Sequence, residues 1–354
     1  MDTVIEIDGS YGEGGGQVLR TALALSALTG KGTRVTNIRA GRSKPGLAPQ
    51  HLTCLLAFAE VCDAAVEGAK IGSTEIAFEP AVKARPGEYT FDVSDVSKWG
   101  SAGSVTLITQ ALLAPLSLAA GPSRLTLKGG THVPWSPPYD FVSDVYLPAL
   151  SRMGIAAECR LVSWGFYPAG GGRISVDIEP TTSVAPLVIP ERGELKGIHG
   201  RALACNLPSR VAMLMANRAR NLLSEIDAPC QVVPERVRGK GPGACLFLHV
   251  EYENVVVGFS ALGERGKPSE KVAEEACREL IEHDENGAPI TPRLADQLLL
   301  PAALASGRTE FQTSCVTAHL LTAAWVVRQF LPAHIDIEGA EGSPGNVVIE
   351  GVGS

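Results

Sequence analysis

Hydrophobic positions along the chain follow two different spacings. Short stretches such as 4–10 (VIEIDGS) and 124–130 (RLTLKGG) alternate, whereas longer ones such as 17–30 (QVLRTALALSALTG) repeat every three to four residues. Alternation is typical of a half-buried strand and the longer repeat of an amphipathic helix. Because the two kinds of segment take turns along most of the chain, the pattern predicts an interleaved α/β arrangement of the α+β class.

The same pattern predicts how the chain is divided. Strand and helix recur at similar intervals up to about residue 189, which indicates internally repeated units. From about residue 190 a strand, a long helix at 207–226, three further strands and a helix at 268–283 form one compact stretch between turn-rich segments. Helices at 292–306 and 315–330 and two closing strands follow. We therefore predict a larger domain of 1–189 and 288–354 and a smaller α/β domain of 190–287 inserted into it.

Composition limits the kind of partner. The 354 residues exceed the ~250–300 at which one core stops growing, and 45% hydrophobic against 19% charged residues is the profile of a folded protein. A net charge of −7 argues against coating a long nucleic acid, but it permits binding of a terminus. One basic segment, 34–46, holds Arg34, Arg39, Arg42 and Lys44, and it is either a solvated turn or an anion contact.

The chain carries no feature of export or membrane insertion. Its opening residues lack a basic leader, and no segment reaches ~18 consecutive apolar residues. The eight cysteines are scattered without a CxxC pair, which argues against a disulfide framework or a zinc site. We expect a cytoplasmic protein with reduced cysteines and no membrane partner.

Two segments contain candidate chemistry. The turn GEGGGQVLR at 12–20 brings three consecutive glycines to the start of a helix, where backbone N–H groups suit an anion, although a plain structural turn is the commoner use. No GK[ST] follows, so it is not a P-loop. Glu13 would be unfavourable beside phosphates unless a divalent cation lay between them. Arg20 follows about two helical turns after Glu13.

His319 is the second candidate. It lies near the start of an apolar helix with no carboxylate or cysteine at i±4, so a metal pair is not indicated. A core or capping histidine is one interpretation. A neutral nucleophile is the other, because a helix N-terminus disfavours the imidazolium form. Asp296 and Gln297 begin another apolar helix, where capping is the plain interpretation, and no GxSxG elbow supports a serine hydrolase.

Eight segments together resemble the RNA 3'-terminal phosphate cyclase family, and they occur in the family's order over essentially the whole chain. They are EIDGSYGEGGGQVLRTALALS, IRAGRSKPGLAPQHL, GSAGSVTLITQ, GGTHVPWSPPYDF, GFYPAGGGRI, GFSALGERGKPSE, LADQLLLP and CVTAHLLTA. The resemblance implies repeated units of a small sheet with two helices, similar to enolpyruvyl transferases, with a smaller inserted domain. It also implies an ATP-dependent enzyme of the ligase class that acts on RNA 3'-phosphate ends, with a homodimer as a possible assembly.

The resemblance implies specific roles as well. His319 would attack the α-phosphorus of ATP, AMP would pass to the RNA 3'-phosphate, and the 2'-hydroxyl would then close a 2',3'-cyclic phosphate. A divalent cation, Mg²⁺ or Mn²⁺, would lie beside Glu13, and Phe259 would stack on adenine unless it is an inward strand residue. The implied ATP-binding residues are Glu13, Arg20, Arg39, Arg42, Gln50, Gln110, Phe259, Arg293, Leu294, Ala295, Asp296 and Gln297.

Two positions depart from the family pattern, and two alternatives stay open. Arg293 stands where a tyrosine is expected, and Trp164 stands where a basic residue is expected. Arg293 could alter how the nucleotide or the RNA end is bound, so substrate preference stays open. One alternative is a non-enzymatic ribosome-biogenesis relative that serves as an RNA or protein scaffold and lacks the nucleophile. The other is an enolpyruvyl transferase-like enzyme acting on a small metabolite.

Overall fold

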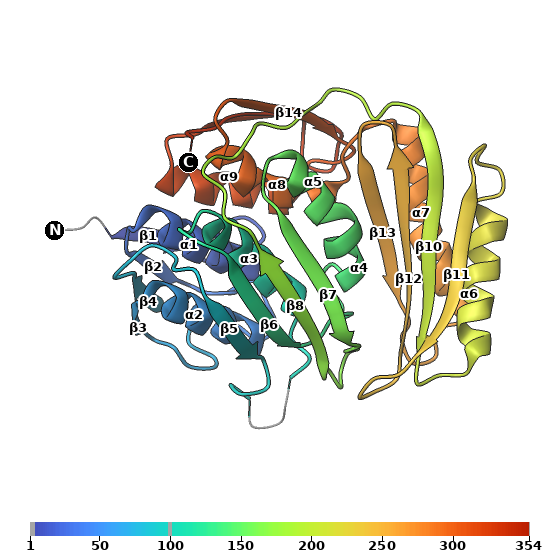
Figure 1. Cartoon of the computed structure of the whole chain (residues 1–354), viewed down its shortest axis with the longest axis horizontal. Coiled ribbons are helices and arrows are strands. Elements are labelled where there is room, and N and C mark those ends of the chain that lie inside the picture. The colour runs from blue at the N-terminus through green and yellow to red at the C-terminus, as the bar shows by residue number, and fades with distance from the viewer. Residues whose placement is uncertain (1–3, 98–100, 354) are drawn as a thin grey trace.

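A computed structural model describes residues 4–97 and 101–353, so Gly100, the first residue of the GSAGSVTLITQ segment, lies outside the described residues. Within these ranges the strands form four sheets of four strands each (Figure 1). Three of the sheets belong to repeated units and the fourth to an inserted stretch. The first unit consists of β1 (Ile5–Asp8), α1 (Gly16–Thr29), β2 (Thr33–Thr36), α2 (Pro49–Cys62), β3 (Ala65–Glu67) and β4 (Ile76–Glu79).

The second and third units repeat this order of elements. The second consists of β5 (Glu88–Asp92), α3 (Val105–Ser117), β6 (Ser123–Gly129), the helical run α4 (Tyr139–Phe141), η1 (Val142–Tyr146) and α5 (Leu147–Arg152), then β7 (Ala157–Ser163) and β8 (Gly172–Ile178). The third consists of β9 (Val188–Ile189), α8 (Pro292–Leu304), β14 (Arg308–Thr313), α9 (Ala318–Phe330), β15 (His334–Glu338) and β16 (Gly345–Glu350).

The three units share one strand topology. In each, the first strand pairs in parallel with the second, the second pairs antiparallel with the fourth, and the fourth pairs antiparallel with the third. The parallel pair requires a crossover, which α1, α3 and α8 supply. This confirms the predicted α+β class and the repeated units of a sheet with two helices.

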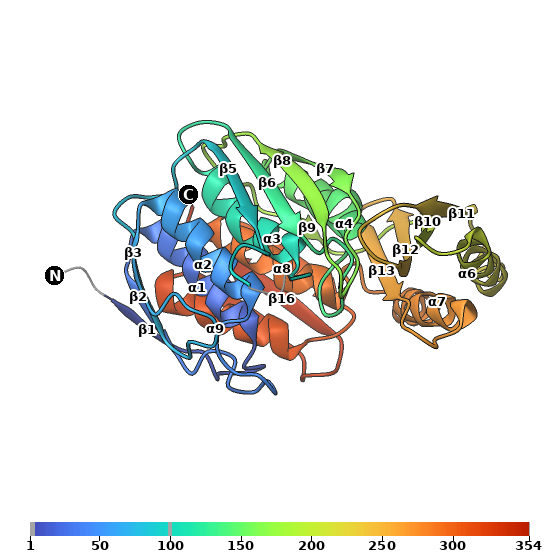
Figure 2. The same ribbon diagram turned by 90° about the horizontal axis from the view of Figure 1, so that it is seen from below.

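The helices of the units pack against one another between the sheets (Figure 2). Helix α1 contacts α2, α3 and α9, and α9 also contacts α8. Leu19 and Leu23 of α1 and Leu320 and Val327 of α9 are fully buried in the shared core. As a consequence, the glycine-rich turn before α1 and the start of α9 lie side by side although about 300 residues separate them.

The fourth sheet is built from one continuous stretch placed between β9 and α8. Its strand order is β11-β10-β12-β13, and α6 and α7 pack against it. Figure 1 shows this stretch at the right of the molecule. The boundaries of the two proposed domains stay a prediction. The elements are β10 (Leu195–Cys205), α6 (Ser209–Leu222), β11 (Cys230–Val237), β12 (Gly243–Tyr252), β13 (Val256–Leu262) and α7 (Ser269–Asn286).

Several element boundaries differ from the sequence prediction. Strands β3, β9 and β14 were not predicted; β3 and β9 contain only three and two residues, too few for a period to register. Helix α9 begins at residue 318 instead of 315, because the Thr317 hydroxyl accepts the Leu320 N–H at 3.1 Å and caps the helix there. All eight cysteines are free, as expected. No helix in the described part of the chain has the length and apolar character needed to cross a membrane.

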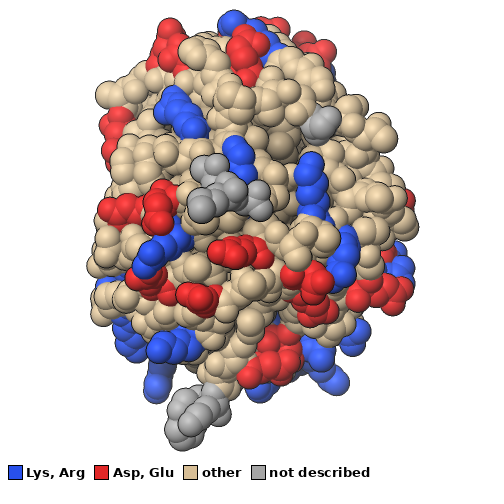
Figure 3. Space-filling model, turned by 90° about the vertical axis from the view of Figure 1, so that its left-hand side faces the viewer, with Lys and Arg blue, Asp and Glu red and all other residues tan. Residues whose placement is uncertain are grey.

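Charged side chains of both signs are interspersed on the face that carries the first sheet (Figure 3). Arg34 of β2, for example, binds Glu75 through its Nε at 2.6 Å. This mixture agrees with the acidic net charge and gives that face no broad basic surface among the described residues. Binding of an anionic partner therefore depends on local sites.

Candidate active site

The glycine-rich turn after β1 is fixed onto helix α9. Gly12 and Gly14 have positive φ angles of 61° and 58°, which side chains other than glycine rarely adopt. A Cβ atom on Gly12 would lie 2.1 Å from Thr322 Oγ1, and the Glu13 N–H donates to the same oxygen at 3.2 Å. The turn thus lies directly on the helix that carries His319.

The His319 ring is half-exposed at this turn, and two acceptor oxygens face one of its nitrogens. Its Nδ1 lies 2.8 Å from Gln17 Oε1 and 3.7 Å from Glu13 Oε1. A carboxylate has no proton to donate, so we assign the ring proton to Nδ1, which donates to Gln17. The other nitrogen, Nε2, then keeps a free lone pair.

The surroundings lower the pKa of His319 from its usual value. Partial burial is the main cause, because it disfavours the charged ring. The cations of Arg20, Arg42 and Arg293 act in the same direction, and the carboxylate of Glu13 opposes them. The ring is therefore neutral at pH 7, which is the form that has a nucleophilic nitrogen.

The start of α1 is open to an anion. Gly15 is its N-cap, no side chain caps the helix, and its first turn holds no acidic residue. A Cβ atom on Gly16 would lie 2.0 Å from His51 Nε2 and 3.0 Å from Arg20 Nη1. Only glycine therefore lets both side chains reach this helix end, where backbone N–H groups and the helix dipole attract negative charge.

His51 is buried beside this helix end, and its Nδ1 has no hydrogen-bond partner. Burial lowers the pKa of His51 well below its usual value, and the nearby Arg20, Arg39 and Arg42 add to this. The ring is neutral. An unpaired buried nitrogen costs free energy unless it gains a hydrogen-bond partner. We therefore expect a bound ligand to provide the partner that His51 Nδ1 lacks.

The four cations of the basic segment do not act as one patch. Arg34 pairs with Glu75 on the first sheet. Arg39 has a positive φ of 54° and donates from Nη1 to the carbonyl oxygens of Lys44 at 2.9 Å and Gly46 at 2.8 Å. Its guanidinium therefore holds the loop. Arg42 forms an ion pair with Glu13 and is the cation of the segment that the structure places at the glycine turn.

Asp296 sits in the second turn of α8 with a buried Oδ1 that has no partner. Burial raises the pKa of Asp296 to about 7, against the opposing effect of Arg293 and Arg20. Leu294 and Ala295 are fully buried, so their side chains serve the core. Any nucleotide contact from these two residues would have to come from the backbone.

Two glutamines connect helices around the site. Gln110 of α3 donates from Nε2 to Gln297 Oε1 of α8 at 2.7 Å, and Gln50 Oε1 of α2 accepts the Ser104 N–H at 2.8 Å. The structure therefore assigns both predicted residues a role in joining units. Each amide group also has other donors and acceptors. Contacts of Gln50 and Gln110 with a nucleotide stay a prediction.

The remaining predicted residues lie toward the inserted stretch. Phe259 of β13 is only 6% exposed, and its ring lies 5.5 Å from that of His283, so its inward strand position is the observed one and adenine stacking stays a prediction. Arg293 reaches Ser260 Oγ at 3.4 Å. Trp164 lies under the guanidinium of Arg201, 5.4 Å from its ring centroid.

Sequence reasoning missed the role of Gln17. It lies in the first turn of α1, directly after the glycines, and orients the His319 ring. A polar residue is common at the start of a helix, so the sequence alone does not single out Gln17. Its role becomes visible only when the structure places α9 beside the start of α1. Of the predicted residues, the structure brings together Glu13, Arg20, Arg42 and His319, and it places Phe259 apart in the inserted stretch.

The described residues contain no group of three or more histidine, cysteine, aspartate or glutamate side chains able to hold a metal ion. Glu13 is the one carboxylate at the turn, its side chain is 9% exposed, and it pairs with Arg42. Mg²⁺ is commonly held by one or two carboxylates together with substrate phosphates and water. Glu13 therefore fits a cation that arrives with a phosphate ligand and does not fit one bound by protein alone.

Comparison with known proteins gives consistent matches along the chain. A profile described as RNA 3'-terminal phosphate cyclase matches residues 11–337. A protein of that name from Methylococcus capsulatus is 48% identical over 350 residues, covering 99% of this chain and 97% of the relative. Another, from Desulfurococcus amylolyticus, is 43% identical over 360 residues, covering 99% of each.

One solved structure was also compared, that of the enolpyruvyl transferase NikO from Streptomyces tendae. It aligns with a TM-score of 0.44 at 14% identity, over 100% of this chain and 49% of its own length. The chain thus spans about half of that structure, and nothing below depends on the likeness. The matched profile and the relatives show that the chain belongs to the RNA 3'-terminal phosphate cyclase family.

Proposed function

We propose that the chain converts an RNA 3'-terminal phosphate to a 2',3'-cyclic phosphate at the expense of ATP, with His319 as a covalent nucleophile. Membership of the family supports the overall reaction. The orientation of the His319 ring supports its assignment as the nucleophile. Gln17 and Glu13 face Nδ1, so Nε2 is left for the reaction at the glycine turn.

In the first step His319 Nε2 attacks the α-phosphorus of ATP. A P–N bond forms, the bond between the α-phosphorus and the bridging oxygen breaks, and pyrophosphate leaves with that oxygen. The ring becomes cationic as the bond forms, and Glu13, 3.7 Å from Nδ1, stabilises this charge. The open end of α1 and Arg20 are placed to hold phosphate oxygens during the displacement.

In the second step an oxygen of the RNA 3'-phosphate attacks the same phosphorus. The P–N bond breaks, its electron pair returns to Nε2, and an anhydride between the RNA phosphate and AMP is formed. In the third step the neighbouring 2'-hydroxyl attacks the RNA phosphorus, loses its proton and expels AMP. The anhydride is needed because a phosphate monoester has no good leaving group of its own.

ATP and a divalent cation, Mg²⁺ or Mn²⁺, are part of this proposal. Such a cation would be held by Glu13 and by phosphate oxygens and would neutralise charge on the phosphates. Arg42 pairs with Glu13 in the present arrangement. Binding of cation and nucleotide would therefore release Arg42 from this pair, which frees a guanidinium for a phosphate.

The test is labelling of the protein with ATP that carries ³²P at the α-position, in the presence of Mg²⁺ or Mn²⁺ and without RNA. We expect label on the wild-type chain and none on His319→Ala. His334→Ala, at an exposed histidine of β15, is the matched control and should label normally. Equal labelling of both variants would refute the assignment, and no labelling of the wild type would favour a scaffold or a different transferase.

A further inference from the structure

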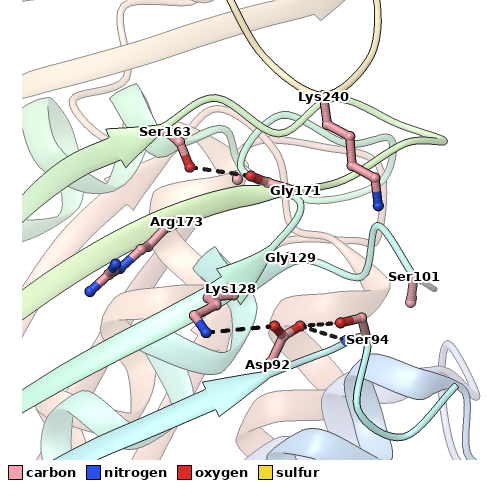
Figure 4. Close-up of a pocket in the computed structure, with 10 residues that line it drawn as sticks. Asp92, Ser94, Ser101, Lys128, Gly129, Ser163, Gly171, Arg173 and Lys240 are labelled. Carbon is pink, nitrogen blue, oxygen red and sulfur yellow. Dashed lines mark hydrogen bonds and ion pairs between the residues drawn. The ribbon is translucent and has the colours of Figure 1, made fainter.

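A hollow that His319 does not line lies at one end of the sheet β5-β6-β8-β7 (Figure 4). Its volume is about 300 Å³, at the lower limit of small-ligand pockets. It uses the glycine-rich segment 165–172, to which the proposed reaction assigns no role. The lining residues are Asp92, Ser94, Ser101, Lys128, Gly129, Ser163, Gly171, Gly172, Arg173 and Lys240.

One row of residues across the sheet gives the hollow its charge. Asp92, Lys128, Arg173 and Ser163 are directly opposite one another on the four neighbouring strands. Lys128 and Arg173 are thus two cations in one cross-strand pair. Like charges in this position destabilise a sheet unless an anion lies between them.

The carboxylate in this row is shared between Ser94 and Lys128. Asp92 Oδ1 accepts the Ser94 N–H at 2.9 Å and the Ser94 hydroxyl at 2.6 Å, and Lys128 Nζ lies 3.9 Å from Oδ2. Among residues 4–97 and 101–353, no carboxylate lies within ion-pair distance of Arg173 or Lys240. Three cations against one carboxylate leave the lining with a net charge of +2.

The third cation comes from the inserted stretch, and glycines let it approach. A Cβ atom on Gly171 would lie 2.8 Å from the Cβ and Cδ atoms of Lys240, and Gly171 has a positive φ of 75°. The loop that carries Lys240 is held by a parallel bridge between Gly239 and Trp164. The lysine is therefore placed by the backbone over the ends of the strands, as Figure 4 shows.

The hollow is connected to the His319 site by a short run of contacts. Ser101 lines the hollow, and a Cβ atom on Gly103, two residues later, would lie 2.8 Å from Gln50 Cβ. Gln50 precedes His51, whose Nε2 approaches Gly16 at the open end of α1. Residues 101–103 and 50–51 thus link the hollow to the open end of α1.

We propose that the hollow binds a phosphodiester phosphate of the RNA strand, on the 5' side of the reacting end. This inference rests on the proposed function, because it takes RNA as the substrate. Two flanking cations and a lysine above them match one or two backbone phosphates, which carry one negative charge each. The site reads no base, so it would favour longer strands over short ones without selecting a sequence.

The test measures RNA binding apart from the reaction. A fluorescein-labelled RNA of 12 nucleotides ending in a 3'-hydroxyl, which cannot be activated, is titrated with protein at several KCl concentrations, and binding is followed by anisotropy. Lys128→Gln/Arg173→Gln is compared with Lys70→Gln/Lys83→Gln, which removes two exposed lysines outside the hollow. Lys240→Gln is a third variant. Thermal unfolding checks that each variant is folded.

We expect Lys128→Gln/Arg173→Gln to bind at least about tenfold more weakly and to lower the slope of log Kd against log salt by about 0.7 to 1.4, since each lost phosphate contact on a single strand contributes about 0.7. The control should change affinity less than about twofold. Equal affinities and slopes in both double variants overturn the inference. Labelling of His319 by ATP alone decides the proposed function separately, because it requires no RNA.

Discussion

Asp296→Asn should make the protein more stable at high pH and change it little at low pH. Asp296 has a buried Oδ1 without a partner, and burial raises the pKa of its carboxyl from 3.8 to about 7. A raised pKa means that the folded chain binds the proton more tightly than the unfolded chain. The carboxyl therefore costs folding free energy once the pH exceeds the unfolded pKa, and this cost grows until about pH 7.

The magnitude follows from the two pKa values. One pKa unit corresponds to about 1.36 kcal/mol. Between pH 5 and pH 8 the free energy of unfolding of the wild type should fall by roughly 2–3 kcal/mol through Asp296, the linkage expected for a carboxyl with a pKa of 3.8 when unfolded and about 7 when folded. The asparagine side chain does not titrate, so the free energy of unfolding of the variant should not fall for this reason between pH 5 and pH 8.

Urea unfolding at pH 5 and pH 8 measures the effect. The free energy of unfolding of Asp296→Asn relative to wild type should rise by roughly 2–3 kcal/mol between the two pH values. Asp336→Asn, at an exposed aspartate of β15, provides the control and should show little change. If the difference between Asp296→Asn and wild type is the same at both pH values, the reasoning from burial is wrong.

Three further predictions concern the proposed adenylylation. Gln17→Ala removes the oxygen 2.8 Å from His319 Nδ1 and should slow labelling from ATP by about 10- to 100-fold, as for other residues that orient a reactive imidazole; Gln17→Glu should restore most of the rate, and a normal rate in Gln17→Ala would count against the orienting role. The pKa of His319 is lowered from 6.5, so the neutral ring persists to lower pH than in a free histidine and the labelling rate should fall with a midpoint below pH 6.5; a midpoint at or above 6.5 would contradict this. Gly16→Ala puts a methyl group 2.0 Å from His51 Nε2 and should abolish ATP binding in calorimetry, whereas unchanged affinity would show that this helix end is not used.

Much of the fold follows from local pattern. The long helices have clear apolar periodicity, and Gly30 ends α1 in the left-handed conformation with φ of 75°, as its sequence position predicts. The identical order of strands in the three sheets follows less directly, because pairing depends on long-range contacts. The two-residue strand β9 illustrates this: it exists only because β14 pairs with it across the inserted stretch.

The sequence singles out His319 and the glycine turn, which the structure brings together, but it does not show which residues contact them. His319 and the glycine turn stand out as local motifs, but the contact of Gln17 with His319 joins positions 302 residues apart. Arg39 shows the opposite case. The resemblance implied a nucleotide or RNA phosphate contact, which stays a prediction, and the positive φ of Arg39 and its bonds to two loop carbonyls show in addition that it holds the loop.

The separation of Gln17 and His319 by 302 positions also affects biosynthesis. A ribosome that adds about 5–20 residues per second needs roughly 15–60 s to proceed from one to the other. During that interval the glycine turn has been synthesised without His319. Under the proposed mechanism, nascent chains cannot consume ATP by this route until α9 has been translated and has docked against α1.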